Sequence, residues 1–228
     1  MPTASSTSAP GRRGIVAAVA GTAVLTVAGV LALVVGLRPS SGPPQPPRTN
    51  NSSSAAQSSA PVPQAAAPAA GSTLAVKTLP RSRPVELLIP SIGVRSAAFV
   101  GLGKQPDGSL EVPADFGRPG WFTEGPAPGQ FGPAIIAGHV DSKNGPGLFY
   151  RLGALRPGAV VVVRRADGVP ARFTVDKVER YAKSRFPTVA VYGDANHRSE
   201  LRLITCGGNF DAQTGHYLDN IVAYAHLV

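Results

Sequence analysis

The chain has almost no cysteine: Cys206 is the only one among 228 residues. A single thiol excludes an internal disulfide and any zinc site built from several cysteines. The one cysteine and the four scattered histidines show no metal-ligand spacing, so we expect no metal site. No cofactor is expected either. The cysteine is then either a small buried hydrophobe or an unpaired reactive thiol.

Acidic residues are missing from the first 85 positions, and all thirteen lie at or after Glu86. The formal net charge of +9 therefore comes partly from the N-terminal part of the chain. No basic stripe with interleaved aromatic residues is present in the acid-containing part. The sequence therefore predicts no nucleic-acid partner.

Charge of either sign is absent from residues 14–37, which are mostly Val, Ala and Leu. As a helix this run would be roughly 36 Å long, enough to cross a hydrocarbon core of ~30 Å. Arg12 and Arg13 precede it, so we expect a single-pass signal anchor in the cell membrane, with residues 1–13 in the cytoplasm and the remainder outside. The alternative, a cleaved signal peptide, would have an apolar core of only about 7–15 residues.

Large hydrophobic side chains are scarce in residues 38–84, which are rich in Pro, Ser, Ala, Gln and Asn. Such a segment cannot bury enough apolar surface to offset its chain entropy, so we expect a disordered tether. Residues 85–228 have the length of one ordinary domain with its own core.

Short apolar segments alternate with Gly, Pro, Asn and Asp turns throughout residues 85–228. Asp167-Gly168 is a strong hairpin signal, residues 117–132 are too rich in Gly and Pro for anything but a loop, and residues 148–152 suggest a short helix. Helical periodicity is otherwise rare, which predicts a mostly β fold, a largely antiparallel barrel or sandwich. The predicted strands are residues 85–89, 96–100, 134–139, 159–163, 171–178, 200–206 and 221–224.

His139 and Cys206 share a context, because each ends an apolar strand next to glycine. In a barrel, two such strand ends can lie side by side at one rim. An imidazole beside a thiol can accept the thiol proton and later protonate a departing amine. His216 is a second candidate for the base, and Asp141 either orients the loop after His139 or is a solvated carboxylate.

The chain also resembles a known family, the sortases, which are cysteine transpeptidases of Gram-positive cell walls. The matching segments are Ile89-Pro-Ser-Ile-Gly-Val94, Ala137-Gly-His139, Leu203-Ile-Thr-Cys206, Thr214-Gly215 and the closing strand Ile221 to Ala225. Gly138 to Ser142 and Thr205 to Gly208 are most similar to the class F sortases of actinobacteria. The resemblance implies an eight-stranded β-barrel with short helices, with Cys206 as the nucleophile and His139 as the catalytic histidine.

The resemblance further implies cleavage of a Leu-Pro-x-Thr-Gly-like sorting signal through a thioester on Cys206. An amine from a cell-wall precursor or another surface protein would then take the acyl group. Two other functions stay open: an extracytoplasmic cysteine peptidase that ends in hydrolysis, and a non-catalytic tethered β-barrel with Cys206 buried.

One position departs from the family pattern. Sortases carry a catalytic arginine near the start of the last strand, and the matching position here is Asn220. An asparagine amide can donate one hydrogen bond to an oxyanion, but it lacks the charged fork of arginine. Arg118 and Arg202 are the alternatives, although Arg202 lies about 13 Å along the strand from Cys206. The family resemblance suggests that Thr205 supplies a further donor beside the nucleophile.

Overall fold

The computed structural model describes residues 42–46, 77–193 and 197–228. One compact unit spans Pro43–Val228. Within the described residues, no helix has the length and hydrophobicity needed to cross a bilayer. The anchor predicted for residues 14–37 lies outside the described residues.

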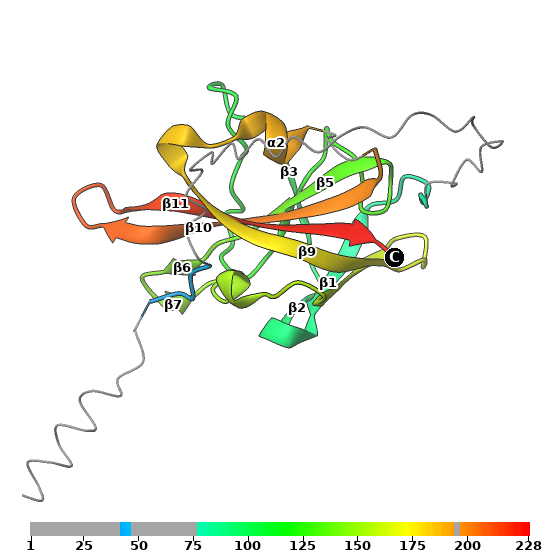
Figure 1. Cartoon of the computed structure of the whole chain (residues 1–228), viewed down its shortest axis with the longest axis horizontal. Helices are drawn as coiled ribbons and strands as arrows, with labels where there is room; N and C mark the ends of the chain where they lie inside the picture. The colour runs from blue at the N-terminus through cyan, green and yellow to red at the C-terminus, as the bar shows by residue number, and fades with distance from the viewer. Residues whose placement is uncertain (1–41, 47–76, 194–196) are drawn as a thin grey trace, which may run out of the picture. The chain divides into compact units, whose positions relative to one another are not determined.

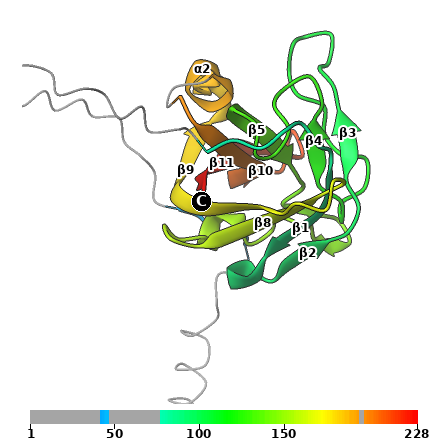
Figure 2. The ribbon, with the colours of Figure 1, turned by 90° about the vertical axis from the view of Figure 1, so that its right-hand side faces the viewer.

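This unit is mostly β and is built on one curled sheet (Figures 1 and 2). In the described residues its nine strands follow the order β2-β1-β8-β9-β11-β10-β5-β4-β3, and β6 and β7 form a separate two-stranded ribbon. The family resemblance implied a barrel of eight strands, whereas the sheet of the described residues has nine. The strands are β1 (Pro84–Ile89), β2 (Val94–Ser96), β3 (Val100–Leu102), β4 (Gly120–Phe122), β5 (Gly132–Ala137), β6 (Asp141–Ser142), β7 (Gly145–Pro146), β8 (Val160–Arg165), β9 (Ala171–Ala182), β10 (Ser199–Asp211) and β11 (His216–Leu227).

β10 lies next to the central strand, β11, with which it pairs antiparallel, and it pairs parallel with β5 on its other side. Alternate residues of these strands face opposite sides of the sheet. One side packs into the main core, which includes Leu201, Leu203 and Ile221. The other side contributes Ile204 and Val222 to a smaller apolar cluster.

Helices are few and short in the described part of the chain. They are η1 (Pro90–Ile92), η2 (Leu152–Ala154), η3 (Lys183–Arg185) and α2 (Thr188–Tyr192). Val191 of α2 belongs to the smaller apolar cluster, so this helix covers the outer side of β10 and β11. The short helix predicted for residues 148–152 lies further along the chain: residues 148–151 form a turn, and the helix η2 begins only at Leu152.

Most of the predicted strands are present, with different ends. The hairpin at Asp167-Gly168 joins β8 to β9, with Gly168 at a φ of 81°. The strand predicted at residues 96–100 is instead two strands, β2 and β3. The predicted loop 117–132 contains β4, in which the buried Trp121 pairs with Ile136. This strand was hidden by the glycines and prolines around it.

Two described parts of the predicted tether, residues 42–46 and 77–84, differ from the expectation of disorder. The Leu79 N–H donates to the Gly129 carbonyl at 2.7 Å, and Pro84 begins β1. Further upstream, Pro46 is buried. These segments make contacts that a prediction from composition alone does not include.

Candidate active site

The pairing of β5 with β10 brings the segment that carries His139 to the part of β10 that carries Cys206. The parallel pairing of the two strands sets Ile204 opposite Ala137, and the Gly138 N–H donates to the Ile204 carbonyl at 3.0 Å. β5 ends at Ala137, two residues before His139, whereas β10 continues past Cys206 to Asp211, so the strand end predicted at Cys206 is wrong. The paired backbones are held together two residues before each of the two side chains.

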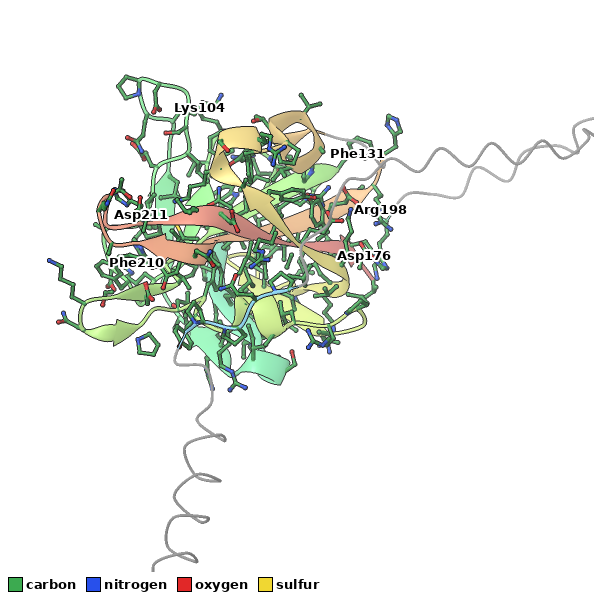
Figure 3. All side chains as sticks on the ribbon, turned by 60° about the vertical axis from the view of Figure 1, so that its left-hand side comes forward. Lys104, Phe131, Asp176, Arg198, Phe210 and Asp211 are labelled. Atoms are coloured by element: carbon green, nitrogen blue, oxygen red, sulfur yellow. The ribbon has the colours of Figure 1, made fainter. Side chains whose placement is uncertain are left out.

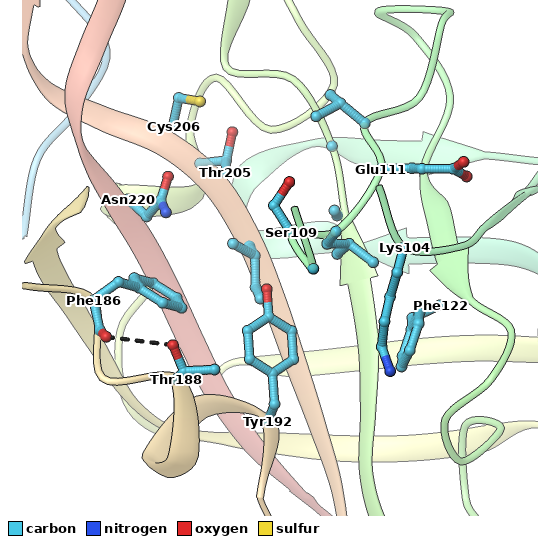
Figure 4. Close-up of a pocket in the computed structure, with 16 residues that line it drawn as sticks. Lys104, Ser109, Glu111, Phe122, Phe186, Thr188, Tyr192, Thr205, Cys206 and Asn220 are labelled. Atoms are coloured by element: carbon cyan, nitrogen blue, oxygen red, sulfur yellow. Dashed lines mark hydrogen bonds between the residues drawn. The ribbon is translucent and has the colours of Figure 1, made fainter. Parts of the chain in front are cut away.

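The Cys206 thiol is partly exposed. It lines a pocket together with Asn220, its partner on β11 (Figure 4). A purely structural cysteine would be buried in the core, so this placement favours a thiol that a reactant can reach.

His139 is held by the loop between β3 and β4. Its Nε2 lies 2.6 Å from the Pro113 carbonyl, and the Phe116 ring lies 4.1 Å from the imidazole, centroid to centroid. A carbonyl oxygen can only accept, so Nε2 carries the hydrogen, and in the neutral ring Nδ1 keeps the lone pair. This contact therefore selects the tautomer in which Nδ1 is the basic atom.

The pocket beside Cys206 has a volume of about 630 Å³ and mostly apolar walls (Figure 4). The β3–β4 loop forms one wall, and the segment from Phe186 to Tyr192 forms the other. Burial raises the pKa of the Tyr192 phenol, so this wall presents a neutral hydroxyl. The lining residues are Lys104, Gly108, Ser109, Leu110, Glu111, Val112, Phe122, Ala137, Gly138, Phe186, Thr188, Tyr192, Ile204, Thr205, Cys206 and Asn220.

Arg202 does not line this pocket, and this corrects the expectation that it could contact the oxyanion or the substrate. Its guanidinium is buried, pairs with the Glu200 carboxylate at 2.6 Å and stacks over the Tyr224 ring at 4.6 Å. These contacts belong to a second pocket, which also includes Asp176 and Arg198, at the end of β10 away from Phe210 (Figure 3). Arg202 lies four residues before Cys206 along β10, and its guanidinium is held in the second pocket by the ion pair with Glu200.

Arg118 does not line the pocket either, although its buried Nε has no hydrogen-bond partner. In fact no arginine of the described residues lines it; Lys104 is the cation there, paired with Glu124 at 3.4 Å. Thr205 does line the pocket, and its buried Oγ1 has no hydrogen-bond partner. Asn220 and Thr205 are therefore the sequence-derived polar candidates that lie with Cys206.

Asp141 is neither free nor fully solvated: it accepts a hydrogen bond from the Tyr217 hydroxyl. Burial and this hydrogen bond raise the pKa of Tyr217, so the phenol stays protonated. The pair ties β6, just after His139, to β11. Sequence reasoning missed Tyr217, since nothing local marks a tyrosine for a partner 76 positions away. His216 is exposed at the start of β11 and does not line the pocket.

The profile of the Sortase domain family matches residues 87–228, which is more than half of the chain. The chain belongs to the sortase family. Sortases are cysteine transpeptidases, and the match includes every candidate site residue named above. Comparison with curated protein sequences gives no match.

Solved sortase structures are similar to this chain at low identity. Sortase A from Corynebacterium diphtheriae is 17% identical, with a TM-score of 0.49 over 65% of this chain and 62% of that one, less than two thirds of its length. Sortase C-1 from Actinomyces oris is 19% identical, with a TM-score of 0.48 over 64% of this chain and 74% of that one. A Clostridium perfringens sortase D5 transpeptidase is 17% identical, with a TM-score of 0.46 over 64% of this chain and 79% of that one.

Proposed function

We propose that this sortase cleaves a Leu-Pro-x-Thr-Gly-like sorting signal between Thr and Gly. Cys206 forms the thioester, and His139 acts as acid and base. An amine of a cell-wall precursor or of another surface protein then takes the acyl group. The observation that supports the proposal is the parallel pairing of β5 with β10, which holds the backbone segments of His139 and Cys206 together, with the partly exposed thiol in the lining of an apolar pocket.

The proposed reaction balances without a cofactor. The Cys206 thiol gives its proton to His139 Nδ1, and the thiolate adds to the carbonyl carbon of the scissile amide. The protonated imidazole then gives that proton to the departing glycine amine, which leaves a thioester. In the second half, His139 takes a proton from the acceptor amine as that amine attacks the thioester, and the thiol is released.

The apolar walls of the pocket suit the acyl part of such a peptide. Leu110, Val112, Phe122 and Phe186 all line the pocket. A leucine and a proline buried between them would each release apolar surface from water, at about 25 cal/mol per Å². The pocket thus favours a peptide whose residues before the scissile bond are apolar.

We also propose that residues 14–37 anchor the enzyme in the cell membrane, with the catalytic domain outside the cytoplasm. The support is the uncharged run itself and the paired arginines before it. The class F assignment stays a prediction that rests on Gly138 to Ser142 and Thr205 to Gly208.

Amine capture distinguishes a transpeptidase from a hydrolase. Incubation of the full chain with a Leu-Pro-x-Thr-Gly peptide and a millimolar primary amine should yield mainly the peptidyl amide, identified by mass spectrometry. Release of the free acid at every amine concentration would support the cysteine peptidase instead. Absence of any cleavage, together with an inert thiol, would support the binding module.

Asn220→Ala should lower the transfer rate by about 10²-fold if the amide donates to the oxyanion. The loss should appear in kcat more than in KM, because the oxyanion exists only in the transition state. Asn144→Ala, at an exposed turn between β6 and β7, is the matched control and should leave the rate unchanged. An unchanged rate in Asn220→Ala would remove this residue from the site.

A further inference from the structure

A short proline-rich segment, Pro43-Pro44-Gln45-Pro46, lies against the catalytic domain, although thirty residues separate it from Lys77. Pro46 is buried, and the three residues before it are half-buried. We call residues 43–46 the clamp. In Figure 3 the clamp, drawn in light blue, passes below the long strands of the sheet.

The Gln45 side chain joins the clamp to β10. Its Oε1 accepts the Gly208 N–H at 2.8 Å, and its Nε2 donates to the Pro43 carbonyl at 3.0 Å. Both ends of the amide group are therefore used: one end braces the clamp itself, and the other reaches the strand that carries Cys206.

Gly208 needs an acceptor from outside the sheet. The pairing of β10 with β11 shifts between Gly207 and Phe210, so two residues of β10 face one of β11. A bulge of this kind leaves an N–H without its ladder partner. Gly208 also has a φ of 78°, a left-handed conformation that glycine adopts without strain. Gln45 thus satisfies the free amide of a bulge two residues after Cys206.

The surface under the clamp lacks side chains where the clamp passes. A Cβ added to Gly153, in η2, would lie 2.1 Å from the Pro44 carbonyl oxygen and 3.0 Å from Pro46 Cδ. A Cβ on Gly207 would lie 3.1 Å from Gln45 Oε1. η2 and β10, which are far apart in the sequence, therefore each have a glycine where the clamp passes.

We propose that Gln45 is a positioning residue, which holds the bulge after Cys206 and thereby holds the thiol in the pocket. The inference rests on the proposed role of Cys206. A Cβ on Gly207 would meet Ile221 of the main core, whereas Cys206 lines the pocket on the other side of the sheet. The clamp therefore lies on the side of the sheet opposite to the pocket beside Cys206 and leaves that pocket open.

Gln45→Ala in the full chain tests this role. Amide hydrogen exchange at Gly208 should accelerate about three- to tenfold, the equilibrium value of one hydrogen bond. The kcat for a sorting peptide and the rate of Cys206 alkylation by iodoacetamide should both change, while KM stays within about twofold, because the pocket is untouched. Gln45→Glu keeps an oxygen acceptor at the same reach and should restore both. Gln213→Ala, whose side chain is exposed, is the matched control.

Gly153→Ala tests the clamp without altering Gln45 or β10. Its new Cβ would collide with the Pro44 carbonyl, so the clamp must move away. We expect the same faster exchange at Gly208. Combining the change with Gln45→Ala should give no additive effect, because both changes remove the same contact between Gln45 and Gly208.

The possible outcomes separate the clamp from the proposed function. Unchanged exchange at Gly208 in Gln45→Ala would overturn the clamp. Faster exchange with unchanged alkylation and unchanged kcat would overturn the positioning role. If the unmodified chain cleaves no sorting peptide while exchange and alkylation still respond to Gln45→Ala, the proposed function is wrong and the clamp stands.

Discussion

Cys206→Ala should abolish formation of the thioester on a sorting peptide and reduce turnover to background. No other thiol exists in the chain, so nothing can replace the nucleophile. In unmodified protein, mass spectrometry after a short incubation should show the acyl adduct on a peptide that contains Cys206, and the variant should show none.

Two controls make this result specific. Thermal unfolding of Cys206→Ala should stay close to that of the unmodified chain, because the thiol is partly exposed and fills little of the core. Alkylation of the native domain should label Cys206 at a rate comparable to an accessible thiol. Retained turnover in Cys206→Ala would rule out the assigned nucleophile, and an inert thiol in the native domain would favour the binding module.

His139→Ala should lower the rate of peptide cleavage by about 10²- to 10⁴-fold, the usual contribution of a general acid–base group. The imidazole has two tasks in the proposed cycle, so both thioester formation and its resolution by amine should slow. Burst kinetics with a chromogenic sorting peptide measure the two steps separately.

His216→Ala is the matched control for this variant. His216 is exposed, and it is the other histidine that the sequence offers as a base. We expect its replacement to leave the rate within about twofold, as for most exposed side chains away from a site. A large loss in His216→Ala with full activity in His139→Ala would exchange the two assignments.

Two contacts from one loop hold the His139 ring. The Pro113 carbonyl fixes a hydrogen on Nε2, and the Phe116 ring covers one face of the imidazole. Both contacts come from the β3–β4 loop, which also forms one wall of the pocket. Under the proposed function, a peptide bound against this wall would contact the loop that orients the imidazole.

Local features of the sequence were enough for much of the fold. Short apolar segments between turn residues predicted β1, β8, β9, β10 and β11, because such runs bounded by turn signals are typical of strands. Asp167-Gly168 predicted its hairpin, because a tight turn needs a left-handed glycine. The same reasoning missed β4, where three residues pair between glycine- and proline-rich turns.

The sequence by itself determined that the lone thiol and one histidine each follow a short apolar segment and lie next to glycine. Only the tertiary structure decided that the two segments pair, because the parallel pairing of β5 and β10 joins residues 67 positions apart. The tertiary structure also places Arg202 in a buried ion pair with Glu200, and it places Gln45 beside the amide of Gly208. Such contacts depend on how distant segments pack together, and no local pattern of residues encodes that packing.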